Sequence, residues 1–418
     1  MPTSWPQPAV LQNLLPSTTE GKEQSTTSSV SFDHRVLALY KFVSPKIPKD
    51  SLPDLKKELE TVCRQYSARG TLLIAEEGIN GTICYPYSQQ DENGNEDSSS
   101  DKNKQSSDEL LSFLQGKFDN SLRIRVSAAD KPVFARLKIK IKSEIVTMHW
   151  WGDKNCSNAT NNENKDSIGE CDQSTPATSC GPCCPTERVG KYVKPNAWNE
   201  LLEDPDTLVI DTRNEYEIDV GTFRNAINPH TQSFVEFPDW IQKNLVDKKS
   251  NENNIKATQT NPFQDKKKIA MFCTGGIRCE KATNAAMQLI PKDIPVYHLE
   301  GGILAYLDEV SEKESMFDGD CYVFDQRVAV TYKNKPSTTF RQKCHACRHP
   351  LSNQDLERQD YKHGVHCRYC IGTLTDKQEE RFAQRQKQIQ LALEKGQKHI
   401  HDPKEVAMEN KKKKVCTR

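Results

Sequence analysis

The stretch Ile269-Ala270-Met271-Phe272-Cys273-Thr274-Gly275-Gly276-Ile277-Arg278 is the segment from which the fold of this chain is best inferred. Its first four residues are apolar and predict a strand, and the following run Cys279–Met287 predicts a helix. Cys273 therefore opens a glycine-containing loop between the end of a strand and the N-terminus of a helix. In such a loop, N–H groups and the positive end of the helix dipole stabilise negative charge on sulfur and lower the thiol pKa.

The composition of the loop favours sulfur chemistry. Gly275 and Gly276 let the backbone curl without a steric penalty, and Arg278 adds a fixed positive charge. We expect the backbone of the loop to surround the sulfur: Thr274, Gly275, Gly276 and Ile277. Four residues separate Cys273 from Arg278, one fewer than in a Cys-x5-Arg phosphatase loop, so phosphate chemistry is disfavoured. The alternative is a buried core cysteine, because cysteine is among the most buried residue types.

Three other segments resemble parts of a rhodanese domain. Val209–Glu217 resembles its opening strand, Gly221–Asn228 its second motif and His298–Ile303 its closing strand. The sequence Cys-Thr-Gly-Gly-Ile-Arg-Cys-Glu-Lys at 273–281 points to a narrower group than rhodanese domains in general. It resembles the rhodanese-type tRNA uridine 5-hydroxylases, which use molecular oxygen to convert the wobble uridine to 5-hydroxyuridine. The likeness extends from about Arg35 to Cys370, apart from three insertions.

This resemblance implies an oxidoreductase that modifies tRNA and contacts its anticodon region, with molecular oxygen as co-substrate. It also implies that Cys273 and Arg278 are the catalytic residues. Cys279 resembles a resolving thiol that forms a disulfide with Cys273 or protects its sulfenic acid, and the equal alternative is a structural thiol of the helix. Three working forms of Cys273 stay open: thiolate, sulfenic acid and persulfide.

Two other functions compete with hydroxylation. In a sulfurtransferase, Cys273 would take sulfane sulfur from thiosulfate or a donor protein and pass it on as a persulfide. The loop chemistry supports both activities equally well. The rest of the chain favours the hydroxylase, because a sulfur carrier needs neither a partner domain nor a metal module. A non-catalytic RNA or protein adapter is disfavoured by the intact Cys273.

The composition narrows the class of protein. The 418 residues include 58 lysines and arginines and 58 aspartates and glutamates, so any nucleic-acid binding needs a local patch. Only 35% of the residues are hydrophobic, which predicts that part of the chain is disordered. No apolar run approaches the ~20 residues of a membrane span, and residues 1–31 lack the pattern of a secretory signal. We expect no membrane association and no obligate protein partner.

Cysteine usage indicates the compartment. The fifteen cysteines include pairs at catalytic and metal-binding spacings, which favours a reducing compartment over a disulfide framework. We expect a cytoplasmic protein, with an organelle as the alternative. Cys180, Cys183 and Cys184 could bind metal or be redox-active, but no second pair lies nearby, and their role stays open.

The fold class expected is a combination of α+β and α/β domains. The order of predicted elements near the N-terminus, βαββαβ with a tight turn at Gly78–Gly81, is typical of a ferredoxin-like domain. Farther along, apolar strands alternate with helices, which predicts a rhodanese-like parallel sheet covered on both faces. The expected segments are a disordered leader (1–33), the ferredoxin-like domain (34–152, with a low-complexity insert at 88–107), a disordered insert (153–187), the rhodanese-like catalytic domain (188–313, with an insert at 248–266), a zinc-binding module (314–374), and a polar helix with a basic tail (375–418).

A second constellation has the spacing of a metal site. Cys344-His345-Ala346-Cys347 and Cys367-Arg368-Tyr369-Cys370 form two CxxC pairs with nineteen residues between them. Four thiolates at this spacing can close a tetrahedral zinc site that staples a segment too short to form its own core. The alternative is two unrelated redox pairs. Because four cysteines leave no position for water, we expect Cys344, Cys347, Cys367 and Cys370 to have a structural or RNA-presenting role.

The run Arg136-Leu137-Lys138-Ile139-Lys140-Ile141-Lys142 predicts a strand with two different faces. The cations Arg136, Lys138, Lys140 and Lys142 would share one face, and Leu137, Ile139 and Ile141 would face the core. Cations two residues apart lie roughly 6.5–7 Å from each other, close to a phosphate repeat, so this ladder could follow an RNA backbone. The equal alternative is an edge strand kept soluble by lysines.

Overall fold

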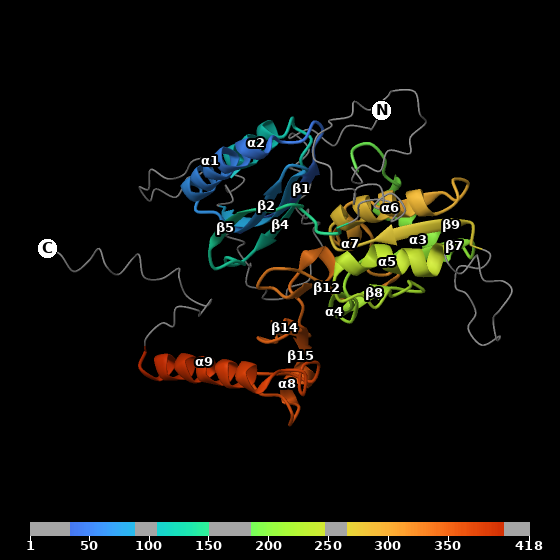
Figure 1. Cartoon of the computed structure of the whole chain (residues 1–418). Coiled ribbons are helices and arrows are strands. Elements are labelled where there is room, and N and C mark those ends of the chain that lie inside the picture. Colours follow the sequence, from blue (N-terminus) through green and yellow to red (C-terminus); the bar gives the residue numbers. More distant parts are fainter. Residues whose placement is uncertain (1–33, 88–106, 150–184, 247–265, 397–418) are drawn as a thin grey trace, which may run out of the picture.

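The computed structural model describes residues 34–87, 107–149, 185–246 and 266–396 (Figure 1). These residues form an N-terminal domain, a central domain, a cysteine module and a C-terminal helix. The expected leader and basic tail, most of the inserts, and Cys180, Cys183 and Cys184 lie outside the described residues.

The N-terminal domain is an antiparallel sheet with strand order β4-β1-β3-β2, which confirms the ferredoxin-like prediction. A fifth strand, β5 (Leu137–Ile141), is added parallel to β2 at the edge of the sheet. The other elements are β1 (His34–Phe42), α1 (Leu52–Gln65), β2 (Arg69–Ala75), β3 (Gly78–Pro86), α2 (Ser107–Lys117) and β4 (Arg123–Ala129). The turn predicted at Gly78–Gly81 is wrong, because β3 already begins at Gly78 and the chain turns at Glu76 and Glu77.

The two helices cover one face of this sheet. Leu59 and Cys63 of α1 pack with Leu110 and Leu114 of α2 against the alternate strand residues that point toward the helices. The opposite face is turned toward the central domain and carries Tyr40, whose neighbour Leu39 is a core residue of the helix-covered side. Strand alternation therefore gives the sheet one structural face and one face available to the rest of the molecule.

The edge strand β5 only partly follows its predicted pattern. Leu137 and Ile139 contact the helix-covered core, as expected. Ile141 does not contact it, and its side chain, at the end of the strand, is 42% exposed. The cations Arg136, Lys138, Lys140 and Lys142 are all exposed.

The central domain has a parallel four-stranded sheet with strand order β6-β10-β9-β7. Its elements are β6 (Lys191–Val193), α3 (Pro195–Glu203), β7 (Thr207–Asp211), α4 (Glu215–Ile218), β8 (Gly221–Phe223), α5 (Phe237–Ile241), β9 (Lys268–Phe272), α6 (Ile277–Leu289), β10 (Val296–Leu299) and α7 (Gly302–Glu309). Along β9, Ile269 and Met271 pack on the side of α5 and α6, whereas Ala270 and Phe272 pack on the side of α3 and α7. The predicted parallel sheet with two covered faces is confirmed.

After α7 the chain adds a hairpin to the central domain. β11 (Phe317–Gly319) pairs with β8, and β12 (Cys321–Tyr322) pairs with β13 (Ala329–Val330). The segment Val323–Val328 between these two strands, here called the bridging turn, reaches the N-terminal domain. There the Gln326 N–H donates to the Val133 carbonyl at 3.0 Å, and Arg327 Nη1 donates to Ser127 Oγ at 3.4 Å.

The cysteine module follows and is small. It contains β14 (Phe340–Lys343), β15 (Pro350–Ser352) and α8 (Asn353–Glu357), and the polar helix α9 (Asp376–Glu394) comes after it (Figure 1). Its buried core consists of Leu351 and three of the four paired cysteines. Across the described residues, no helix combines the length and the apolar character that a bilayer crossing requires.

Charged residues of helix α6, which belongs to the central domain, bind the N-terminal domain. Lys281 Nζ lies 2.9 Å from Glu77 Oε1, 2.6 Å from Glu144 Oε2 and 2.8 Å from the Val146 carbonyl. The Lys281 side chain is only 4% exposed, so its charge depends on these N-terminal partners. The helix that begins at the cysteine loop is therefore fixed to the N-terminal domain.

Candidate active site

The cysteine loop begins where β9 ends and closes where α6 starts. Cys273 follows the last residue of β9, and the Gly276 N–H donates a hydrogen bond to Cys273 Sγ at 3.1 Å. Gly276 precedes the first residue of α6 and has φ +92°, a left-handed conformation that glycine adopts at no steric cost. The sequence therefore needs glycine at this position to turn an N–H toward the sulfur.

The carbonyl groups of the loop are bound by helix α7. The Ile303 N–H donates to the Cys273 carbonyl at 2.9 Å, and the Leu304 N–H donates to the Thr274 carbonyl at 3.1 Å. Gly302 makes this approach possible, because a Cβ there would lie 2.5 Å from the Cys273 carbonyl oxygen. With its carbonyls directed at α7, the loop is left with N–H groups to face the sulfur.

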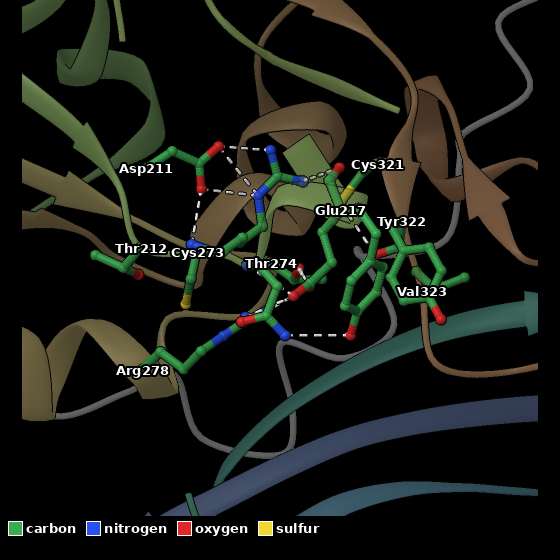
Figure 2. A network of polar contacts seen from close by, with 12 residues as sticks. Asp211, Thr212, Glu217, Cys273, Thr274, Arg278, Cys321, Tyr322 and Val323 are labelled. Carbon is green, nitrogen blue, oxygen red and sulfur yellow. Dashed lines mark hydrogen bonds and ion pairs between the residues drawn. The ribbon is translucent and has the colours of Figure 1, made fainter. Parts of the chain in front are cut away.

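The charge of Arg278 is balanced by a buried carboxylate. Arg278 Nη1 and Nη2 each lie 2.7 Å from an oxygen of Glu217, whose side chain is fully buried (Figure 2). Burial would raise the pKa of Glu217, but the charge and hydrogen bonds of Arg278 lower it below its ordinary value. Arg278 therefore acts on Cys273 through its charge, while its hydrogen-bonding groups are engaged by Glu217.

A second ion pair supports the segment that carries Glu217. Arg213 is completely buried and binds Asp211 at 2.6 Å, and the same guanidinium donates to the carbonyl groups of Glu217 and Gly221. Thr222 Oγ1 also donates to Asp211, at 2.8 Å. The carboxyl end of β7 is thereby tied to α4, which sets the position of Glu217.

These contacts make Cys273 an acidic thiol. Burial alone would raise the pKa of Cys273, but it is outweighed by a hydrogen bond with the Cys279 thiol, the charge of Arg278 and the N–H groups of Cys279 and Gly276. The resulting pKa of Cys273 is about 6. Burial and the interaction with Cys273 raise the pKa of Cys279, so Cys279 stays protonated and donates. At neutral pH the Cys273 sulfur is mostly thiolate.

Core cysteines of this protein have the opposite pKa shift. Burial raises the pKa of Cys63 in the N-terminal core to about 12, and burial raises the pKa of Cys321 beneath the bridging turn to about 12. Cys273 is equally inaccessible, with 0% exposure, yet its pKa moves down. The lowered pKa therefore distinguishes Cys273 from an inert core cysteine, whose pKa burial raises.

A cavity of about 410 Å³ lies beside the loop and is shared by both large domains. This volume is within the ~300–1,000 Å³ typical of small-molecule sites. Its wall contains Cys273, Thr274, Gly275, Ile277 and Arg278 from the loop, Leu39, Tyr40, Leu73 and Ile124 from the N-terminal sheet, and Val323 and Phe324 from the bridging turn. The cavity is mainly apolar and has the acidic thiol in its wall.

Each arginine that lines the cavity is paired with a carboxylate. The pairs are Arg123 with Glu280 at 3.6 Å, Arg125 with Asp308 at 3.0 Å, Arg278 with Glu217 at 2.7 Å, and Arg327 with Asp325 at 2.6 Å. The positive charges at the cavity wall are therefore locally neutralised.

The N-terminal domain contacts the loop directly through Tyr40. A Cβ on Gly276 would lie 3.3 Å from Tyr40 Oη, so the hydroxyl packs against the glycine whose N–H binds the sulfur. The same hydroxyl donates to Glu280 Oε1 at 2.9 Å, and the Tyr192 hydroxyl donates to that oxygen at 3.0 Å. Burial raises the pKa of Glu280 above its ordinary value, against the opposing effects of Arg123 and these hydrogen bonds.

The structure also brings the four cysteines of the module together. Their Sγ atoms all lie within 4.8 Å of one another, and the closest contacts are 3.7 Å for Cys344–Cys370 and 3.7 Å for Cys347–Cys367. A tetrahedral site with Zn–S bonds of ~2.3 Å has sulfur–sulfur edges of roughly 3.8 Å. The donor set and its dimensions therefore fit a closed zinc site.

Three residues of the site were not singled out by the sequence. Glu217 appeared only inside the segment that resembles rhodanese, and its capping-box spacing from Asn214 was the available signal, since it marks a helix beginning after a strand. Tyr40 and Phe324 lie far from the loop in sequence and carry no such signal. Their contribution depends on the way the domains meet.

Two protein-family models match the chain. Residues 34–145 match the UPF0176 acylphosphatase like domain, and residues 194–309 match the rhodanese-like domain. The first covers the N-terminal domain, and the second contains the cysteine loop and Glu217. The cavity lies between the two matched regions and also includes the bridging turn, which follows both.

A curated relative covers nearly the whole chain. The tRNA uridine(34) hydroxylase of Rhizobium leguminosarum bv. trifolii (strain WSM2304) is 41% identical over 366 residues, which span 87% of this chain and 96% of the relative.

Two solved structures resemble only short portions of the chain. One is a protein of unknown function, a possible tyrosine phosphatase, from Rhodopseudomonas palustris CGA009, with 21% identity and a TM-score of 0.21 over 30% of this chain and 83% of that protein. The other is a thiosulfate sulfurtransferase from Pseudomonas aeruginosa, with 15% identity and a TM-score of 0.20 over 29% of this chain and 18% of that protein. Similarity at this level is too low to indicate a function.

The acidity of Cys273 can be tested through its hydrogen-bond donor. Replacing Cys279 by alanine should raise the pKa of Cys273 from about 6 to between roughly 7 and 8, because a hydrogen bond to a charged group contributes about 1.5–3 kcal/mol. The measurement is the pH titration of ultraviolet thiolate absorbance, taken as a difference from Cys273→Ser protein. Cys63→Ala, which removes a distant buried thiol, is the control and should leave the titration in place. A Cys273 titration unchanged by Cys279→Ala would contradict this assignment.

Proposed function

The chain belongs to the tRNA uridine(34) hydroxylase family, and on this premise we propose that it hydroxylates C5 of the wobble uridine of tRNA. Molecular oxygen is the co-substrate, and Cys273 is the reactive residue. The observation that supports this proposal most directly is an acidic thiol in the wall of a cavity large enough for a small ligand. The activity belongs where tRNA is modified, in the cytoplasm or in an organelle.

We assign the roles of the loop residues from their contacts. Cys273 lies in the cavity wall and supplies the thiolate, and the Gly276 N–H stabilises its negative charge. Arg278, held by Glu217, supplies a fixed positive field beside the sulfur. Cys279 donates its proton toward Cys273 and is close enough to serve as a resolving thiol. The backbone of Thr274, Gly275 and Ile277 completes the wall.

Sulfur transfer is the second candidate, because an acidic loop cysteine in a rhodanese-like domain is also suited to carry a persulfide. A persulfide carrier, however, does not need a cavity to which a second domain contributes much of the wall. Tyr40, Leu73 and Ile124 of the N-terminal sheet line this cavity, which favours a substrate larger than a sulfur donor.

We propose that the exposed cations of β5 bind the tRNA backbone. In the register of the sheet, Lys140 pairs with Leu73, which lines the cavity, and Lys138 pairs with Thr71. The two lysines point away from the helix-covered core, as does the cavity-lining Leu73. Partial burial and repulsion by Arg136, Lys140 and Arg348 lower the pKa of Lys138, which brings an arginine of the cysteine module into the same cluster. A polyanion that follows these charges passes close to the cavity.

We propose that zinc occupies the four-cysteine site and has a structural role. Cys344, Cys347, Cys367 and Cys370 provide all four ligands, which leaves no coordination position for a substrate. The module has a very small apolar core, so the metal would contribute much of its stability.

The reaction is tested by Cys273→Ser. Cells that lack the endogenous enzyme should lose 5-hydroxyuridine and the nucleosides derived from it, and the wild-type gene should restore them with label from oxygen gas, whereas Cys273→Ser should not. The measurement is nucleoside mass spectrometry of total tRNA. Restoration by the serine variant would refute the role of the thiol. Unchanged hydroxyuridine with loss of a thiolated nucleoside would instead establish sulfur transfer.

Metal analysis tests the zinc proposal. Protein purified under reducing conditions should contain about one zinc per chain, and Cys344→Ser should lose it and unfold the module at lower temperature. Cys63→Ala, a buried cysteine outside the cluster, should retain the full zinc content. Metal-free wild-type protein with unaltered thermal unfolding would exclude a structural zinc site.

Salt dependence tests the cationic strand. Changing Lys138, Lys140 and Lys142 together to glutamine should weaken tRNA binding. It should also flatten the salt dependence by about 0.7–0.9 in log–log slope for each phosphate that the strand no longer neutralises. The control is a triple change to glutamine of Lys49, just before α1, and of Lys56 and Lys57 within α1. It removes the same charge on the helix-covered side of the sheet and should have little effect. Equal effects of the two triple variants would show that only net charge matters.

A further inference from the structure

Phe324 in the bridging turn is the most exposed large apolar side chain among the described residues, with 59% exposure. Its neighbours Val323 and Asp325 are buried, as are both strands of the hairpin. An exposed phenylalanine between two buried neighbours leaves apolar surface in water without a packing benefit. A role in contacting another molecule would explain why this side chain is exposed.

The turn that carries Phe324 is held firmly on both sides. Within the turn, the Val323 N–H donates to the Val328 carbonyl at 2.9 Å, and Arg327 donates to both oxygens of Asp325. Toward the N-terminal domain, the Gln326 N–H donates to the Val133 carbonyl at 3.0 Å. The backbone on which Phe324 is presented is thus fixed to both domains.

Phe324 also lies where it can contact a ligand beside Cys273. It lines the same cavity as Cys273 and Thr274, and its high exposure places it where the cavity meets solvent. Its ring packs edge-on against Tyr322, with centroids 5.1 Å apart and an interplanar angle of 90°. A single perpendicular neighbour covers at most one face of the ring, so with 59% exposure Phe324 keeps apolar ring surface for another partner.

The arginines of the cavity are already paired, so its wall offers apolar surface and the aromatic rings of Tyr40, Phe234 and Phe324 rather than free charge. Of these three rings, only Phe324 is largely exposed. A nucleobase is a flat group that stacks on aromatic rings, and enzymes that modify a base move it out of its stack into such a pocket. We propose that Phe324 is the stacking platform for the nucleobase presented to Cys273, an inference that rests on the proposed tRNA substrate.

The test uses the full-length protein and an anticodon stem-loop RNA with a fluorescent uridine analogue at position 34. The wild type should quench this fluorophore on binding, and Phe324→Ala should bind the RNA with most of the quenching lost. On the natural uridine, Phe324→Ala should lower kcat/KM by roughly 10- to 100-fold, mainly through KM, because one stacked base contributes that factor. Phe324→Trp should restore both signals, and Phe324→Leu, which keeps apolar volume without a ring, should restore neither.

Two further measurements keep the outcomes separate. Leu393→Ala removes an exposed apolar side chain of α9, 54% exposed, and should leave quenching and turnover unchanged. A Cys273 titration that stays at about pH 6 shows that the variants keep the active-site loop intact. Wild-type quenching without hydroxylation would refute the proposed function and leave the stacking role standing. Undiminished quenching and kcat/KM in Phe324→Ala would overturn the stacking role.

Discussion

The negative charge on a fully buried sulfur is the constraint on which the rest of this structure depends. An isolated ion in the protein interior is strongly unfavourable, so the Cys273 thiolate needs compensation from every side. The loop provides the Gly276 N–H, helix α6 provides the Cys279 thiol, and Arg278 adds positive charge that Glu217 in turn balances. The glycines at the loop and at the start of α7 exist to allow these approaches.

The same constraint explains why the two large domains form one functional unit. Helix α6 begins at the loop, and its Glu280 and Lys281 find their partners in the N-terminal domain. Tyr40 of that domain packs against Gly276 and lines the cavity. Because the interface fixes the helix and the helix fixes the loop, the position of the N-terminal domain and the environment of Cys273 are coupled.

Local features of the sequence predicted much of this arrangement. The strand–loop–helix around Cys273, the ferredoxin-like order and the two CxxC pairs follow from spacing and periodicity within short segments. The ion pair between Arg278 and Glu217 could not be predicted in this way, because the two residues are 61 positions apart and no local pattern connects them. Ile141 was expected in the core because alternation gives only the face of a residue, whereas its 42% exposure at the strand end depends on packing that alternation does not contain. The place of Phe324 in the cavity wall could not be predicted either, because it depends on how the bridging turn contacts both domains.

The paired arginines have a consequence for the way a polynucleotide enters. Each guanidinium at the cavity wall already neutralises a carboxylate, and the Ile303 and Leu304 N–H groups of α7 are bound to loop carbonyls. Neither feature is available to an incoming phosphate, which would have to give up its water without a counter-charge. For the tRNA substrate proposed above, this charge balance favours an uncharged base over a phosphate inside the cavity. The sugar–phosphate chain would then stay outside, toward the lysines next to the cavity in the register of β5.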